Sequence, residues 1–201
     1  MKRRPSAEDL AAARDRTVPD VVDVGLAVLF CGINPGLWSG ALGQHFARPG
    51  NRFWPALYRS GFTPRQLRPD EQNEMPRYGL GITNLVARTT ARADELTTCD
   101  LLDGARRLSR LVAEQRPGWV AVLGVTAYRV GFQERQATIG RQTKSVAGAG
   151  IWVLPNPSGL NAHYQLDALA DEFTRLREAA AVPIAGPPRR SASGSRSRRL
   201  G

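Results

Sequence analysis

Two asparagine-proline dipeptides follow apolar runs of this sequence, and their loops contain the residue types best suited to chemistry. The run at 24–31 continues into GINPG, which contains Asn34, and the run at 151–154 continues into PNPSGLN, which contains Asn156. An asparagine cannot act as a general base, but it can hold a water molecule, and exposed glycine N–H groups can bind phosphate oxygens. Such segments also form simple turns. Two of them at matching places leave a ligand site and a pair of turns as equal alternatives.

Aromatic and basic residues alternate between these loops, in the segment GQHFARPGNRFW at 43–54. This alternation suits stacking on a nucleic-acid base with a phosphate alongside. Phe46 lies in the loop itself and is the better stacking candidate. Phe53 and Trp54 are expected to be core residues of the following helix. A further glycine-punctuated apolar segment, at 79–86, contains one amide, Asn84.

Apolar runs and helical patterns alternate along the chain and must position these loops. Strands are predicted at 24–31, 119–124 and 151–154, the last preceded by a turn at 148–150; helices are predicted at 51–60, 100–115 with Asp100 as N-cap, 126–132 and 164–180. This order predicts an α/β fold, a three-layer α/β/α sandwich with a central, largely parallel sheet. Ligands bind beyond the carboxyl ends of such strands, which is where both loops would project.

Composition divides the 201 residues into one domain and two loose ends. Residues 1–22 are predicted to be a flexible lead-in, 23–181 the domain, and 182–201 a disordered basic tail. The net charge of +10 and pI of about 10.9 favour a polyanionic partner, although part of that charge is in the tail. No apolar run reaches the roughly 20 residues that span a bilayer, so we expect a soluble intracellular protein without membrane contact.

The scarce metal-ligating and nucleophilic residues exclude several chemistries. Cys31 and Cys99 lack the spacing of a zinc or redox motif, and His45 and His163 are the only histidines, so no metal site is expected. The only lysines, Lys2 and Lys144, are at a loose terminus and in a polar turn, which disfavours an imine-forming enzyme. The absence of a Walker loop and of a G-x-G-x-x-G fingerprint argues against a nucleotide-binding protein.

Four segments in order resemble the mismatch-specific uracil- and thymine-DNA glycosylases, a branch of the uracil-DNA glycosylase superfamily. They are GINPG, FARPGNRFW, GITNLVARTT and WVLPNPSGLN, and the resemblance covers residues 24–178. It implies the uracil-DNA glycosylase-like fold and an enzyme that flips a wrong base from duplex DNA into a pocket.

The resemblance also implies roles for residues of the first loop and its surroundings. Asn34 matches the catalytic asparagine, which positions the attacking water, and Phe46 matches the residue that stacks on the flipped base. Backbone groups around Ile33 and Phe46 would read the pyrimidine edge. Asn84 falls where thymine-DNA glycosylases have a pocket asparagine, and Ser39 lies near the position that crowds the methyl group of thymine. We therefore expect a preference for uracil.

The second loop resembles the family's wedge. Leu160 would fill the space left by the flipped base. Gly159 and Asn161 would offer backbone groups to the opposing guanine, Ser158 would hold a phosphate, and Asn156 is counted among the substrate-binding residues. Family members often have an arginine two residues beyond the wedge leucine. This chain has Ala162 followed by His163, which weakens the expected guanine preference.

The sequence thus predicts a base-excision-repair glycosylase that hydrolytically removes uracil, and more weakly thymine or ethenocytosine, mispaired with guanine, leaving an abasic site. It is expected to be monofunctional, cofactor-free and monomeric, and to work on double-stranded DNA in the bacterial cytoplasm, associated with the nucleoid through DNA. Two alternatives stay open. One is a relative specialised for another damaged base, and the other is a non-catalytic reader of mismatched DNA.

Overall fold

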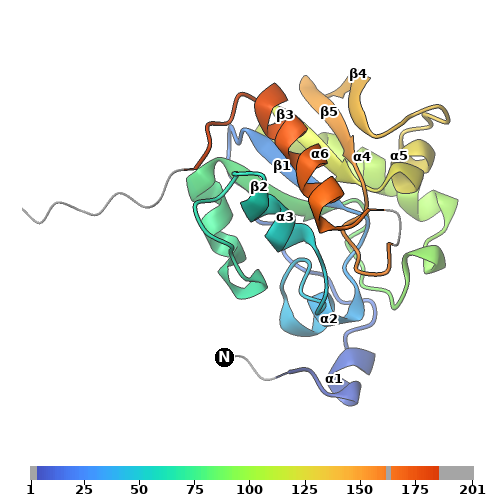
Figure 1. Ribbon diagram of the computed structural model, residues 1–201. Coiled ribbons are helices and arrows are strands. Elements are labelled where there is room, and N and C mark those ends of the chain that lie inside the picture. The colour runs from blue at the N-terminus through green and yellow to red at the C-terminus, as the bar shows by residue number, and fades with distance from the viewer. Residues whose placement is uncertain (1–3, 162–163, 186–201) are drawn as a thin grey trace, which may run out of the picture.

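The computed structural model describes residues 4–161 and 164–185 and shows helices on both faces of one sheet (Figure 1). Most of the predicted basic tail, together with Lys2, Ala162 and His163, lies outside the described residues. The strands are β1 (Val28–Gly32), β2 (Leu80–Asn84), β3 (Trp119–Leu123), β4 (Gly140–Val146) and β5 (Ala149–Leu154). Their order is β2-β1-β3-β5-β4, and every pair is parallel except β4 with β5. The predicted α/β fold with a largely parallel sheet is confirmed.

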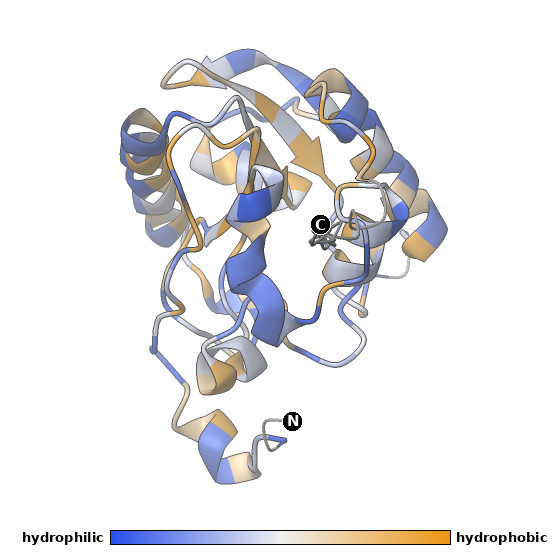
Figure 2. Cartoon of the chain, turned by 90° about the vertical axis from the view of Figure 1, so that its left-hand side faces the viewer, coloured by the Kyte–Doolittle hydropathy of each residue, from blue (hydrophilic) through white to orange (hydrophobic). Residues whose placement is uncertain are grey.

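Alternate residues of β1 enter two separate apolar clusters, because successive side chains of a strand point to opposite faces. Val28 and Phe30 join the cluster under α3 (Phe53–Arg59) and α6 (Leu166–Ala179). Leu29 and Cys31 join the cluster under α4 (Thr98–Gln115) and α5 (Val125–Gly131). The strands are therefore buried on both faces. In the hydropathy colouring of Figure 2, apolar residues are frequent along the central strands and hydrophilic residues along the outer helices.

The remaining elements are short and lie around this sandwich. They are α1 (Ala7–Ala11), α2 (Leu37–Leu42) and two 3-10 helices, η1 (Pro69–Tyr78) and η2 (Ala93–Glu95). In Figure 1, α1 and α2 lie below the sheet, beside the loop that follows β1. No helix in the described parts of the chain has both the length and the apolarity to cross a membrane.

The predicted lead-in, residues 1–22, contributes buried residues and a backbone pairing to the fold. Val18 and Val21 are buried. Val21 also pairs with Ile82 of β2, N–H to carbonyl in both directions at 2.8 Å. This stretch therefore packs against the edge of the sheet, and Pro19 contacts the functional site described below.

Several element boundaries differ from those predicted, each for a local reason. The first strand begins at Val28 rather than Val24, because Gly25 has a φ of +73° and turns the chain. The N-cap of α4 is Thr97 rather than Asp100, which is instead the third helical residue of a capping box. Gly150 belongs to β5, and the turn before that strand is at Ala147 and Gly148, both with positive φ.

Candidate base-binding site

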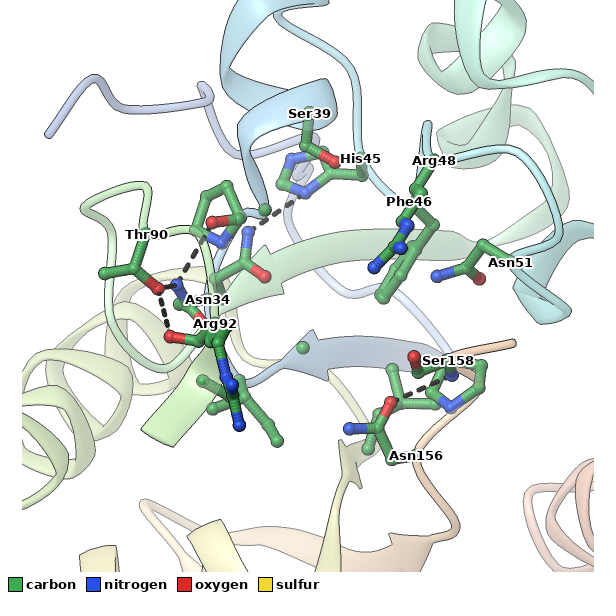
Figure 3. A pocket seen from close by; sticks show the side chains of 18 of the residues that line it. Asn34, Ser39, His45, Phe46, Arg48, Asn51, Thr90, Arg92, Asn156 and Ser158 are labelled. Atoms are coloured by element: carbon green, nitrogen blue, oxygen red, sulfur yellow. Dashed lines mark hydrogen bonds between the residues drawn. The ribbon is translucent and has the colours of Figure 1, made fainter. Parts of the chain in front are cut away.

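One cavity of about 730 Å³ lies beyond the carboxyl ends of β1, β2, β3 and β5 (Figure 3). Parallel strands end at the same edge of a sheet, so their following loops converge there. The lining includes eight of the ten predicted site residues, namely Ile33, Asn34, Ser39, Phe46, Asn84, Asn156, Ser158 and Leu160. Gly159 lines an adjoining cavity of about 380 Å³, and Asn161 lines neither.

The Asn34 side chain is fixed by three acceptors. Its Nδ2 donates to Thr90 Oγ1 at 2.7 Å, to the Pro35 carbonyl at 3.0 Å and to the Arg88 carbonyl at 3.4 Å. The Thr90 hydroxyl donates its one proton to the Arg92 carbonyl at 2.7 Å, so it can only accept from Asn34. This chain of bonds sets the amide orientation and leaves Oδ1 as the acceptor atom of Asn34, a residue that lines the cavity.

Thr90 reaches Asn34 because the segment after β2 runs alongside the loop after β1. Gly36 and Thr90 form a parallel bridge, and the Thr90 N–H donates to the Pro35 carbonyl at 3.2 Å. The Val86 N–H donates to the Ile33 carbonyl at 2.9 Å. The segments that follow β1 and β2 therefore continue the pairing of these strands past the end of the sheet.

Asn84, the last residue of β2, is oriented by a buried histidine. His45 Nε2 lies 2.9 Å from the Pro19 carbonyl, which can only accept, so this nitrogen has the proton. His45 Nδ1 is then the acceptor for Asn84 Nδ2 at 3.1 Å, and Asn84 Oδ1 is left on the other side of the amide. Burial lowers the pKa of His45, which favours this neutral form.

Gly32 and Phe46 shape the cavity next to Asn84. A Cβ atom at Gly32 would lie 2.4 Å from Asn84 Oδ1 and 3.3 Å from the Phe46 ring, so only glycine leaves this space open. Phe46 has a φ of +53° and stacks on Phe53 with ring centroids 4.1 Å apart. A positive φ at a bulky residue is a strained conformation that concentrates at functional sites. Ser39 is buried in the same wall, and its Oγ accepts from the Ala47 N–H at 3.3 Å.

The loop after β5 forms the opposite rim. Asn156 Oδ1 accepts from the Ser158 N–H at 2.9 Å, and Ser158 Oγ accepts from the Leu160 N–H at 3.3 Å. Asn161 Nδ2 donates to the Asn156 carbonyl at 3.0 Å. These turns leave the Leu160 side chain 76% exposed.

A comparison with protein-family models identifies the group to which this geometry belongs. The model of the uracil DNA glycosylase superfamily matches residues 19–180. The chain belongs to the uracil DNA glycosylase superfamily. Membership assigns it a uracil-DNA glycosylase activity in base excision repair, a hydrolase reaction with DNA as its substrate.

Several residues of the site were missed by sequence reasoning. Thr90, His45, Arg48, Asn51 and Arg92 all line the cavity of this superfamily member. His45 and Asn51 were inside the segment flanking Phe46, but neither had a signal beyond its residue type. Thr90 lies 56 residues from Asn34, so only the tertiary fold brings them together.

The site has few other reactive groups. Among the described residues that line the cavity, Asp94 is the only acid, and its carboxylate pairs with Arg92 at 2.6 Å. The described parts of the chain contain no group of three metal-ligating side chains. Cys31 is buried, and burial raises the pKa of its thiol, so it is an unreactive core residue. Lys144 lies on edge strand β4, outside the cavity lining, and pairs with Glu134.

Proposed function

We propose that this glycosylase is specific for mismatches, removing uracil opposite guanine best and thymine or ethenocytosine more weakly. The observation that carries the proposal is the orientation of Asn34. Its NH2 group is occupied by protein acceptors, so Oδ1 is the atom available to hold a water molecule at the sugar. Asn34 is the catalytic residue of this proposal, and Thr90 is its positioning residue.

The reaction is a hydrolysis in which the bond between C1′ and the base nitrogen breaks as water attacks C1′. The electron pair leaves on the base, and a water proton is released to solvent. Asn34 cannot take up this proton, and the Asp94 carboxylate is engaged by Arg92 at the exposed mouth of the cavity. Catalysis then depends on positioning and on stabilising the departing base, which favours slow chemistry on readily flipped bases.

Recognition of the flipped base is assigned to Phe46 and Asn84. One face of the Phe46 ring packs on Phe53, and the ring borders the cavity, where a pyrimidine can stack on it. Asn84 Oδ1 is an acceptor, which matches the N3–H donor of uracil. The fixed Ser39 side chain narrows the same wall, which supports uracil over thymine and its additional methyl group.

Guanine preference is assigned to the loop of Leu160. Leu160 would fill the stack that the flipped base leaves. The carbonyls of Gly159 and Asn161 each accept one hydrogen bond from Arg52. A carbonyl oxygen has two lone pairs, so the second lone pair of each would accept from N1–H and N2–H of the opposing guanine. Adenine has an acceptor at N1 and would be matched less well.

Single-turnover cleavage of labelled duplexes containing G·U, A·U, G·T or G·ethenocytosine tests this proposal. We expect alkali-labile cuts fastest at G·U, slower at A·U, G·T and G·ethenocytosine, and no borohydride-trapped enzyme–DNA adduct. Equal rates at G·U and A·U would remove the mismatch specificity. Tight binding of mismatched DNA without any cleavage would favour a non-catalytic reader, and cleavage of a different damaged base alone would favour the specialised relative.

A further inference from the structure

The guanidinium group of Arg52 binds the loop that contains Leu160 from the outside. It donates to five acceptors, four of which are backbone carbonyls: Ser158 at 3.3 Å, Asn161 at 2.9 Å, Tyr164 at 2.9 Å, Gly159 at 3.3 Å and Gln165 Oε1 at 3.2 Å. Carbonyl oxygens that converge on one point repel each other unless a cation lies between them. Arg52 therefore determines the path of this loop.

Arg52 is itself held firmly. It is the N-cap residue of α3, whose first residues Phe53 and Trp54 are buried in the core. Its N–H donates to the Pro157 carbonyl at 2.9 Å, so backbone and side chain both bind the loop after β5. The helix thus gives the loop a rigid anchor, while the loop's own bonds are short-range turns.

The loop that contains Leu160 is in close contact with the segment just before α3, residues 48–52. A Cβ atom at Gly159 would lie 2.6 Å from the Gly50 carbonyl. Arg52 borders the smaller cavity between these loops and does not line the base cavity. Its side chain is therefore placed to act on the wedge loop rather than on the flipped base.

We propose that Arg52 is the positioning residue for the wedge, fixing the loop so that Leu160 enters the DNA stack without a prior ordering step. This inference rests on the proposed function, in which Leu160 is the wedge. An arginine suits the role because its planar fork spreads five N–H donors over several acceptors, whereas a lysine supplies the charge without that geometry. Loss of the Arg52 guanidinium group would free the loop and slow the extrusion of the base.

Substrates that differ only in the cost of base extrusion test this role. Arg52→Met is expected to slow single-turnover cleavage of G·U by up to about tenfold, which is the loss expected for removing most of the wedge side chain itself. It is expected to leave cleavage unchanged when the uracil lies opposite an abasic-site analogue, because that uracil has no pairing to break. Arg52→Lys is expected to fall between Arg52→Met and wild type on G·U.

A matched control is available on the same helix. Arg59, the last residue of α3, is joined to α6 by an exposed ion pair with Asp167 and lines neither of the two cavities. Exposed pairs contribute little to stability. Arg59→Met is therefore expected to behave as wild type on both substrates, and thermal unfolding shows whether Arg52→Met remains folded.

A double-mutant cycle with Leu160→Ala separates positioning from general damage. If Arg52 acts through Leu160, the double variant is no slower on G·U than the slower single variant. Additive losses, or an Arg52→Met loss equal on paired and unpaired uracil, would overturn the inference. Fluorescence of 2-aminopurine beside the uracil reports extrusion independently of cleavage. If wild type extrudes the uracil but does not cleave, the proposed function is rejected. The role of Arg52 is still tested in that case, because extrusion by Arg52→Met at the wild-type level would overturn it.

Discussion

The loops after β1 and β5 have similar sequences and end at the same edge of the sheet, yet they are held in different ways. The loop after β1 is bound from within, since Asn34 donates to Thr90 Oγ1 and to the carbonyls of Pro35 and Arg88. The loop after β5 leaves Leu160 76% exposed and depends on the side chain of Arg52, the N-cap residue of α3.

This difference matches the demands of two steps. A group that positions water must keep one orientation, so its polar atoms are paired inside the protein and one is left for the water. A wedge must expose apolar surface to enter DNA, so its own side chain cannot be packed and its backbone must be held instead. Both loops have Asn-Pro at their second and third residues, but their neighbours in space decide which step each can serve.

The largest difference between the loops should come from Thr90→Val, which removes the acceptor that orients Asn34. An unsatisfied buried group costs about 1–3 kcal/mol. Single-turnover cleavage of G·U should therefore fall by roughly ten- to hundredfold. The loss should be equal for uracil opposite guanine and opposite an abasic-site analogue, because the cavity acts after extrusion. A loss confined to uracil opposite guanine would mean that Thr90 acts in base extrusion, and it would contradict the separation of the two loops into two steps.

Leu160→Ala should give a smaller and more selective loss. Removing most of this side chain sacrifices about 1.5 kcal/mol of apolar burial in the stack. That corresponds to roughly tenfold in cleavage of G·U. The loss should disappear with the unpaired uracil, and thermal stability should be unchanged because Leu160 is exposed in the free protein. Equal losses on both substrates would contradict a wedge role.

The smallest expected effect is a change in the pH dependence of stability, and it arises from His45 in the wall of the cavity. Burial lowers the folded-state pKa of His45 from 6.5, so below pH 6.5 the unfolded chain binds a proton that the folded protein resists. Stability should therefore fall as pH drops from 6.5 toward the folded-state pKa. In His45→Gln the free energy of unfolding, measured with urea at pH 7 and pH 5, should depend less on pH. If the free energy of unfolding of His45→Gln depended on pH as much as that of wild type, the claim that His45 is held neutral in the folded protein would be wrong.

The sequence was sufficient for those elements whose pattern is local. The runs that became β1, β3 and β5 are apolar on both faces, and α4 and α6 have helical periodicity, so their existence and order were predictable. Strand β4 was missed because it is an edge strand whose exposed residues include Arg141 and Lys144, without an apolar pattern. The apolar segment at 79–86 contained β2, but its glycines concealed the strand.

The site residues also divide into those predictable from local sequence and those that only the fold reveals. Asn34 and Phe46 were identified by their loops and by a family resemblance, and the structure places both in one cavity. Thr90, Pro19 and Arg52 act through hydrogen bonds to partners far along the chain, and no local pattern encodes such pairing. Residue types indicated the chemistry, whereas the orientation of each amide required the fold.

The most direct test compares single-turnover cleavage of a G·U duplex by wild type and Asn34→Ala, with DNA binding measured for both. The account predicts that the variant binds as tightly as wild type and cleaves at least about 10²-fold more slowly, because the water loses its positioning group. Cleavage by Asn34→Ala at the wild-type rate would contradict the assignment of Asn34 as the catalytic residue.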